Sequence, residues 1–233
     1  MKTWKTRSIL AVIAVAACLA VPAQAAVSGP EAPVSNSFIA PDIGGTAALP
    51  AIGSVYVSPA DIHAWLRAGH ELTAEMRASH GLFGNIITGP GGILQGEIET
   101  FDSDLIFDIT GVGPLKGWST QVVIPTKVET HTGPRKLGEP VQSFETNMMR
   151  VEGQIKGHKD FEYLEVVGGT ANGLESPGQT TLYRQKDGNW LVESSFNVKF
   201  QLRYKGARGS KLEGLEGSSE GVITMTAVPA PRG

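Results

Sequence analysis

Two pairs of ionisable residues have the types and the spacing that a catalytic or metal-binding site needs. Glu129 and His131 lie two positions apart in the segment VETHTGPRK, and His158 and Asp160 repeat that spacing in GHKD. In an extended chain, residues at i and i+2 project from the same face of the strand. If the two segments were neighbours, two imidazoles and two carboxylates would converge on a divalent metal or form a general acid/base site.

The same residues also have a structural interpretation. Both pairs lie close to glycine or proline at the expected ends of strands, where polar side chains gather because the chain meets solvent. The sequence contains no GxxxxGK[ST], HExxH or EF-hand pattern that would favour chemistry. Glu129, His131, His158 and Asp160 are therefore the candidate catalytic residues, and His131 and His158 the candidate ligands of a divalent metal. We expect no other cofactor, and we favour a role in folding.

Strands are the elements that would present these side chains. In FDSDLIFDI, apolar residues at 101, 105, 107 and 109 alternate with aspartates, and FNVKFQLRY has the same period of two. Asp187-Gly188 predicts a hairpin between two further strands. Short strands at this spacing predict a mainly β domain over 81–233, folded as an antiparallel β-sandwich or a distorted barrel.

The two most regular strands belong to segments, 97–130 and 192–228, that align as an internal repeat. The aligned pairs are Phe101 with Phe196, Gly111 with Gly206 and, after an insertion of two residues, Leu115 with Leu212. The alignment predicts two related β units that pack on each other, because neither can bury its apolar face alone.

The chain before the β domain is predicted to form a linker and a helix. Residues 26–57 are rich in Pro, Gly, Ala and Ser with few charges, which is typical of an extended linker. Over 58–80, Ser58-Pro59 and Asp61 form a helix start, and apolar residues recur on one helical face. We therefore predict one amphipathic helix, packed with one side on the sheet.

Three histidines fall within this predicted helix. His63 and His70 are seven residues apart, which is about 10 Å along a helix axis, so that a single metal ion cannot bridge them. We expect these two histidines and His80 to face solvent.

The first 25 residues have the three parts of an export signal. Lys2, Lys5 and Arg7 give a positive start, residues 9–21 are apolar, and Ala23-Gln24-Ala25 supplies a cleavage site. The apolar segment is shorter than the roughly 20 residues of a transmembrane helix, and the rest of the chain has no second one. We predict a signal peptide over 1–25 and a periplasmic or extracellular protein.

Cys18 is the one cysteine of the chain and lies inside this signal. Cleavage after Ala25 leaves a mature protein without a thiol, which excludes disulfides and cysteine-ligated metals. The segment VAAC that ends at Cys18 also resembles a lipobox, in which Cys18 would carry a lipid anchor. The apolar run continues to Val21, which favours soluble export over anchoring.

The net charge of the chain argues against a nucleic-acid partner. The formal net charge is −3, and removal of 1–25 takes away three basic residues and no acidic one, which leaves −6. Such a chain lacks the clustered positive potential that nucleic acids require. Basic residues do follow the exposed face of one predicted strand and its turn: Lys199, Arg203, Lys205, Arg208 and Lys211. Solvation accounts for them, and the alternative is an acidic polysaccharide or a lipid headgroup.

Four segments in a fixed order carry a family resemblance. ETHTGPR, PVQSFETNM, SPGQTT and WLVESSF resemble the pattern ETHTxPR, PVQSFxTxM, SPGxTT and WxVxSFF of a family of exported bacterial β-rich proteins. The match runs from Glu129 to Val228, and it departs at Ser195-Phe196, where the family has two phenylalanines. The resemblance implies an exported β protein, and it assigns no activity and no functional residue.

These observations favour a protein that is not an enzyme. We expect an exported structural or binding protein of the cell envelope or the extracellular space, with a protein or polysaccharide partner. The alternative is a secreted hydrolase that uses Glu129 with His131 and His158 with Asp160, with or without a metal. The sequence does not address the oligomeric state.

Overall fold

The computed structural model describes residues 37–58, 64–68 and 71–229, and it describes no side chain between 64 and 73. The predicted signal peptide over 1–25, Cys18, His63 and His70 all lie outside this description. None of the described residues belongs to a helix that is long and apolar enough to cross a membrane.

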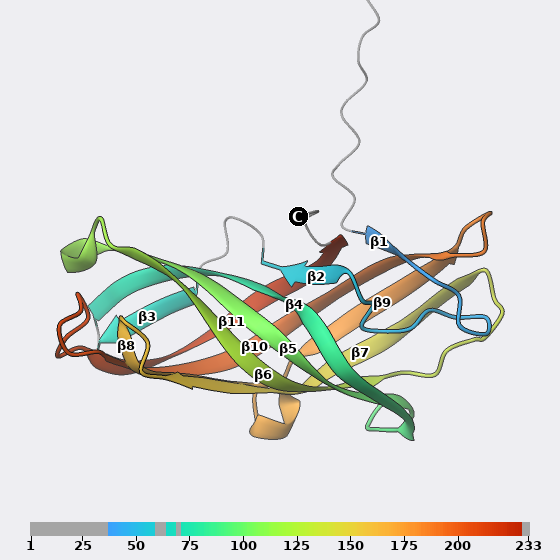
Figure 1. The fold of residues 1–233 in the computed structure, drawn as a ribbon. Helices are drawn as coiled ribbons and strands as arrows, with labels where there is room; N and C mark the ends of the chain where they lie inside the picture. The colour runs from blue at the N-terminus through green and yellow to red at the C-terminus, as the bar shows by residue number, and fades with distance from the viewer. Residues whose placement is uncertain (1–36, 59–63, 69–70, 230–233) are drawn as a thin grey trace, which may run out of the picture. The chain divides into compact units, whose positions relative to one another are not determined.

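The described chain is built almost entirely from antiparallel strands, as predicted (Figure 1). The strands are β1 Ser37–Ala40, β2 Ser54–Val57, β3 Ala64–Ala68, β4 Glu71–Gly91, β5 Gly96–Gly111, β6 Ser119–Thr132, β7 Val141–Lys156, β8 Phe161–Gly168, β9 Pro177–Arg184, β10 Trp190–Gly206 and β11 Glu216–Pro229. Two 3-10 turns, η1 Gly113–Leu115 and η2 Thr170–Asn172, complete the elements.

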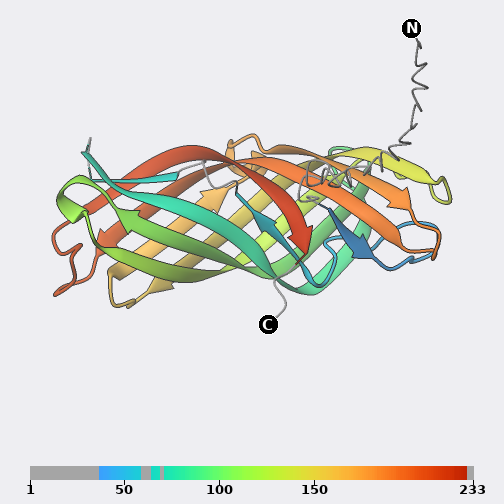
Figure 2. The ribbon, with the colours of Figure 1, turned by 90° about the horizontal axis from the view of Figure 1, so that it is seen from above.

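The strands form one sheet that closes on itself. Its order runs β10, β11, β2, β4, β5, β6 and β7, and from β7 it reaches both β8 and β9, each of which pairs again with β10. The strands curve around a shared interior without being evenly spaced about an axis (Figure 2). The predicted distorted barrel is therefore confirmed.

The side chains that fill this interior come from every second residue of the strands. Along β5, Phe101, Leu105, Phe107 and Ile109 are buried, while the aspartates between them are exposed or half-buried. β10 follows the same pattern from Trp190 to Tyr204. Because every strand of the ring turns one face inward, the apolar residues of all the long strands share one core.

The amphipathic helix predicted over 58–80 is wrong wherever the structure describes the chain. Residues 64–68 form β3, and residues 71–80 open the long strand β4, which pairs with β5 from Ala74 to Gly91. In AEMRASH, the residues at 74, 76, 78 and 80 are buried and those between them are not, which is a period of two. Ala, Glu, Met and Arg favour helices, but pairing along a whole strand overrides propensity.

The predicted linker over 26–57 also differs from the structure in its described part. β1 pairs with β10 and β2 pairs with β11, so both short strands belong to the sheet. We call the segment between them, residues 41–53, the strap. Ala47, Leu49 and Ala51 of the strap are buried. The strap, which is rich in small residues and prolines, therefore packs over one end of the ring and does not extend into open solvent.

The two segments aligned as a repeat form equivalent hairpins, β5–β6 and β10–β11. Gly111 donates its backbone N–H to Trp118 O at 2.8 Å, and Gly206 donates its own to Leu215 O at 2.8 Å. A Cβ atom on either glycine would collide with the backbone of the leucine that follows, Leu115 or Leu212. Both turns therefore need glycine for the same close approach.

Candidate functional site

Glu129 and His131 lie together on the outward face of β6. His131 Nε2 is 2.9 Å from Glu129 Oε1, and His131 Nδ1 accepts the backbone N–H of Ile93 at 3.1 Å. The backbone N–H therefore occupies one ring nitrogen and the Glu129 carboxylate the other. The turn between β4 and β5 covers the ring so closely that a Cβ atom on Gly92 would lie 2.9 Å from His131 Cγ. This histidine fastens a turn, and neither nitrogen is free for a metal.

His158 and Asp160 lie in the turn between β7 and β8. His158 Nδ1 accepts the backbone N–H of Asp160 at 3.2 Å. The Asp160 carboxylate accepts hydrogen bonds from Lys159 Nζ at 2.6 Å and from Trp118 Nε1 at 3.4 Å. Burial acts to raise the pKa of this carboxyl, but the Lys159 hydrogen bond and the other donors outweigh it and lower the pKa. Asp160 thus ties this turn to the β5–β6 hairpin.

The structure does not bring the two pairs together. Lys159 Nζ also contacts Thr120 Oγ1 at 3.2 Å, at the start of β6, whereas His131 is near its end. Eleven residues of extended strand separate Thr120 from His131, which is about 36 Å. Figure 1 shows the corresponding turns, η1 and the β4–β5 turn, at opposite ends of the sheet. Within the described residues, no three His, Cys, Asp or Glu side chains are placed to hold a metal ion.

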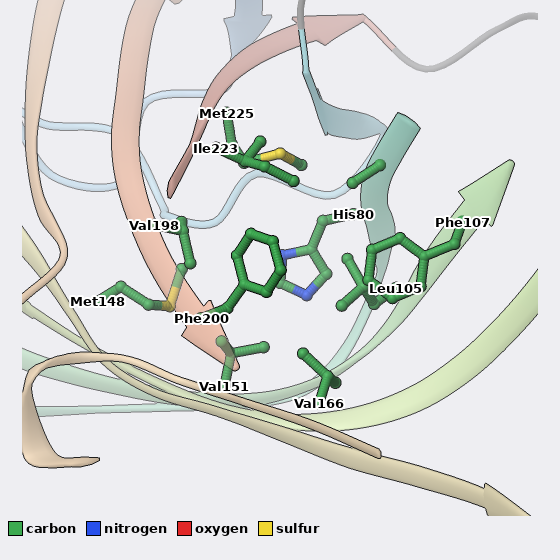
Figure 3. Close-up of a pocket in the computed structure, with 11 residues that line it drawn as sticks. His80, Leu105, Phe107, Met148, Val151, Val166, Val198, Phe200, Ile223 and Met225 are labelled. Atoms are coloured by element: carbon green, nitrogen blue, oxygen red, sulfur yellow. The ribbon is translucent and has the colours of Figure 1, made fainter. Parts of the chain in front are cut away.

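His80 lies inside the ring, and the expectation that it faces solvent is wrong. Its Nε2 contacts Ser103 Oγ at 2.5 Å, and burial lowers its pKa to about 4, so that the ring is neutral near pH 7. Apolar side chains from several strands surround it and line a cavity of about 40 Å³ (Figure 3). A single neutral imidazole among Phe, Leu, Val and Met side chains offers no chemistry beyond its hydrogen bonds.

The basic row on β10 is paired with acidic residues on the outer surface. Lys205 Nζ lies 2.8 Å from Glu162 Oε2, and Arg203 lies 3.8 Å from Glu165, both across the β8–β10 pairing. Exposed pairs of this kind contribute little to stability. Because acidic partners accompany it, this part of the row lacks the excess positive charge that an acidic polysaccharide would need.

A buried charge cluster occupies the end of the ring under the strap. Arg135 Nη2 lies 2.7 Å from Glu97 Oε2 and 2.8 Å from Glu99 Oε1, and Nη1 donates to Ala47 O at 2.7 Å. The guanidinium also stacks over the Phe144 ring at 5.0 Å. We call Glu97, Glu99 and Arg135 the ring-end cluster.

The ring-end cluster carries one more negative than positive charge when both glutamates are ionised. The side chains of Arg135 and Glu99 are each about 5% exposed, while Glu97 is 35% exposed. Burial raises the pKa of Glu99 to about 7, although Arg135 and the Thr130 hydroxyl both act to lower it. Arg135 is shared between two carboxylates, so its single positive charge does not fully compensate the negative charge of Glu99.

A groove of about 360 Å³ opens beside this cluster. Strap residues from Pro41 to Ile52 form one wall, and Ile86 and Thr88 of β4 form another, so the lining is mostly apolar. The ring-end cluster supplies its charged groups. A concave apolar site of this size with a few convergent polar groups is typical of small-molecule binding. We call it the ring-end groove.

The strap is fixed at its first half by polar contacts with distant parts of the chain. Trp190 Nε1 donates to Asp42 Oδ1 at 2.8 Å, and the buried Gln142 donates to Gly45 O at 2.6 Å and accepts from Thr46 Oγ1 at 2.9 Å. With the Arg135 bond to Ala47, these contacts position one wall of the ring-end groove.

The ring-end cluster was not predicted from the sequence, although two of its three residues have a local sequence signal. Glu97 and Glu99 have the same parity as Phe101 in the strand, so they turn toward the ring interior with the core residues. An inward carboxylate needs a cation nearby. Arg135, which follows Gly133-Pro134 in the sequence, is that cation, and it comes 36 residues after Glu99.

Comparison of the chain with family models, with curated proteins and with solved structures finds no match. The case for a function therefore depends on the geometry of the ring-end groove.

Proposed function

We propose that the protein is an exported, non-enzymatic binding protein that holds a small amphiphilic cation, an alkylamine in chemical class, in the ring-end groove. One observation carries the proposal. The mostly apolar groove of about 360 Å³ ends on a buried cluster in which two carboxylates share a single guanidinium. The apolar walls match an alkyl chain, and the excess carboxylate matches an ammonium group.

The energetics of burial support a ligand role for this cluster. Buried ion pairs are often no more stabilising than well-packed apolar residues, because each ion loses its hydration. In the ring-end cluster the loss of hydration is not fully offset, because the pKa of Glu99 is raised to about 7 although an arginine lies beside it. A cation that enters the groove would lower that pKa and relieve the charge deficit. The half-buried Glu97 is the carboxylate that such a ligand meets first.

The charge of the protein and its predicted export agree with this ligand class. The formal net charge of −3 attracts cations and repels anions at long range. An exported protein of this kind would meet small amines in the periplasm or outside the cell. No catalytic group is required, because binding needs only the groove and its two carboxylates.

Calorimetry with three ligands of equal chain length tests the proposal. At pH 8 we expect hexylamine to bind, 1-hexanol to bind at least about tenfold more weakly, and hexanoate not to bind, because a lost charged hydrogen bond costs about 1.5–3 kcal/mol. Glu97→Gln should weaken hexylamine binding about tenfold, while Glu220→Gln, an exposed carboxylate on β11 outside the groove, should not. Equal binding of all three ligands, or no binding, would refute the proposal.

A further inference from the structure

A second, smaller cavity lies next to the ring-end groove, inside the ring. Its volume is about 20 Å³, and Leu49 and Pro50 of the strap close it on one side. Phe101 and Phe196 also line it, together with six residues whose side chains carry a hydroxyl or carboxylate group: Glu99, Thr130, Thr132, Thr146, Thr180 and Ser194. We call it the hydroxyl chamber. Such a group of polar side chains is unusual inside a ring whose core is mainly apolar.

The hydrogen bonds of the hydroxyl chamber are incomplete. Tyr56 donates to Ser194 Oγ at 3.0 Å, and Thr180 Oγ1 lies 2.8 Å from the same oxygen. Thr130 donates to Glu99 Oε2 at 3.0 Å. By contrast, Thr132 Oγ1 and Thr146 Oγ1 have no hydrogen-bond partner among the described residues.

Thr132 and Thr146 are opposite each other in the β6–β7 pairing, and they are 1% and 4% exposed. Buried hydroxyls are nearly always paired in native proteins, so two unpaired ones beside one cavity call for an explanation. Two oxygens that accept hydrogen bonds and a carboxylate that carries negative charge line the same small space. A donor group with a positive charge satisfies all three.

The chamber and the groove share a boundary. Leu49, Pro50 and Glu99 line both of them. Leu49 and Pro50 have no polar side-chain atom, so their displacement breaks apolar packing and no side-chain hydrogen bond. Glu99 therefore lines both a mostly apolar groove of about 360 Å³ and a space the size of one small group.

We propose that the hydroxyl chamber receives the ammonium head of the amine and makes the protein selective for primary amines. This inference rests on the proposed function. A primary ammonium has three N–H donors, and Thr132 Oγ1, Thr146 Oγ1 and the Glu99 carboxylate are three acceptors. A space of about 20 Å³ holds a group of the size of water, which a primary ammonium is. The alkyl chain lies in the ring-end groove.

Methylation of the amine nitrogen removes the N–H donors that the hydroxyl chamber is proposed to recognise. Each methyl group deletes one donor and adds bulk that the chamber lacks room for, and a trimethylammonium group has no donor left. A site that merely attracts positive charge to Glu97 would not distinguish these heads, because they carry the same charge. Selectivity for the primary amine is therefore the signature of the chamber.

The test is a calorimetric series on the full chain at pH 8 with hexylamine and its N-methyl, N,N-dimethyl and N,N,N-trimethyl forms. We expect affinity to fall with each methyl group and to be at least about tenfold lower for the trimethyl form. Thr132→Val and Thr146→Val should each reduce that ratio to about threefold or less. Thr110→Val, which alters an exposed threonine of β5 outside both the groove and the chamber, should leave the ratio unchanged.

The outcomes separate this inference from the proposed function. If the trimethyl form binds the wild type as tightly as hexylamine does, the chamber is not the head-group site, but the groove still binds amines. If the valine variants keep the full ratio, the inference is also overturned. If no amine binds at all, both claims fail. Both valine variants remove a hydroxyl that has no described partner, so we expect them to fold, and thermal unfolding checks that they do.

Discussion

Glu99→Gln should gain stability relative to wild type when the pH rises from 4.5 to 8. The quantity compared is the difference in free energy of unfolding between the two proteins. Burial raises the pKa of Glu99 from its ordinary value of 4.5 to about 7. The folded state thus binds this proton more tightly than the unfolded state does. The stability that Glu99 contributes is fully present below pH 4.5 and is lost as the pH rises through 7. Glutamine does not titrate, so the variant loses nothing over this range.

The size of the effect follows from the pKa shift. A difference of one pK unit corresponds to about 1.36 kcal/mol, and a rise from 4.5 to about 7 therefore gives about 3 kcal/mol. Urea unfolding of both proteins, followed by tryptophan fluorescence at pH 4.5 and at pH 8, measures the difference between them. We expect that difference to move by about 3 kcal/mol in favour of the variant at pH 8.

Comparison of the two proteins at each pH removes the contributions of the groups that do not interact with Glu99, His80 included. Glu220→Gln, which changes an exposed carboxylate, is the matched control and should show no such movement. If the difference between Glu99→Gln and wild type stays constant with pH, Glu99 is not protonated on folding. If it moves in favour of wild type at pH 8, Arg135 fully neutralises Glu99, and the charge deficit on which the ligand class depends does not exist.

Two further predictions concern the buried histidines. Burial lowers the pKa of His80 from 6.5 to about 4, so its contribution to stability is present above pH 6.5 and is lost as the pH falls through 4. Relative to His80→Gln, wild type should therefore lose about 3 kcal/mol between pH 6.5 and 4 in urea unfolding, and a constant difference would contradict the buried neutral ring. His131→Ala removes the hydrogen bonds to Ile93 and Glu129 and should destabilise the protein by about 1–3 kcal/mol without changing the affinity for hexylamine. Unchanged stability together with lost binding would show that His131 belongs to the site.

The sequence predicts the ring strands well, because the burial of one face imposes a period of two. The alternation in β5 and β10 and the Asp187-Gly188 hairpin between β9 and β10 are confirmed. The prediction from the sequence fails for β4, because its helix-favouring residues and the positions of its apolar residues resemble one face of a helix. What decides β4 is its pairing with β5, which comes later in the chain and is not visible in the local pattern.

The candidate site was predictable in part. The spacing of Glu129 and His131 correctly places both side chains together, but their hydrogen bonds serve a turn. The inward parity of Glu97 and Glu99 is a local signal that the sequence contains. Their partner is not local, since Arg135 reaches them only when β6 pairs with β5, and its bond to Ala47 O spans 88 residues. The strap wall of the groove depends on that long-range contact.

Chemical-shift mapping of the protein during titration with hexylamine shows whether the amine enters the ring-end groove. We expect the largest backbone changes on Glu97, Glu99, Arg135 and the strap, and we expect them to saturate with a single affinity. Changes confined to the outer face around Glu129 and His131, or no changes at saturating ligand, would contradict the proposed site.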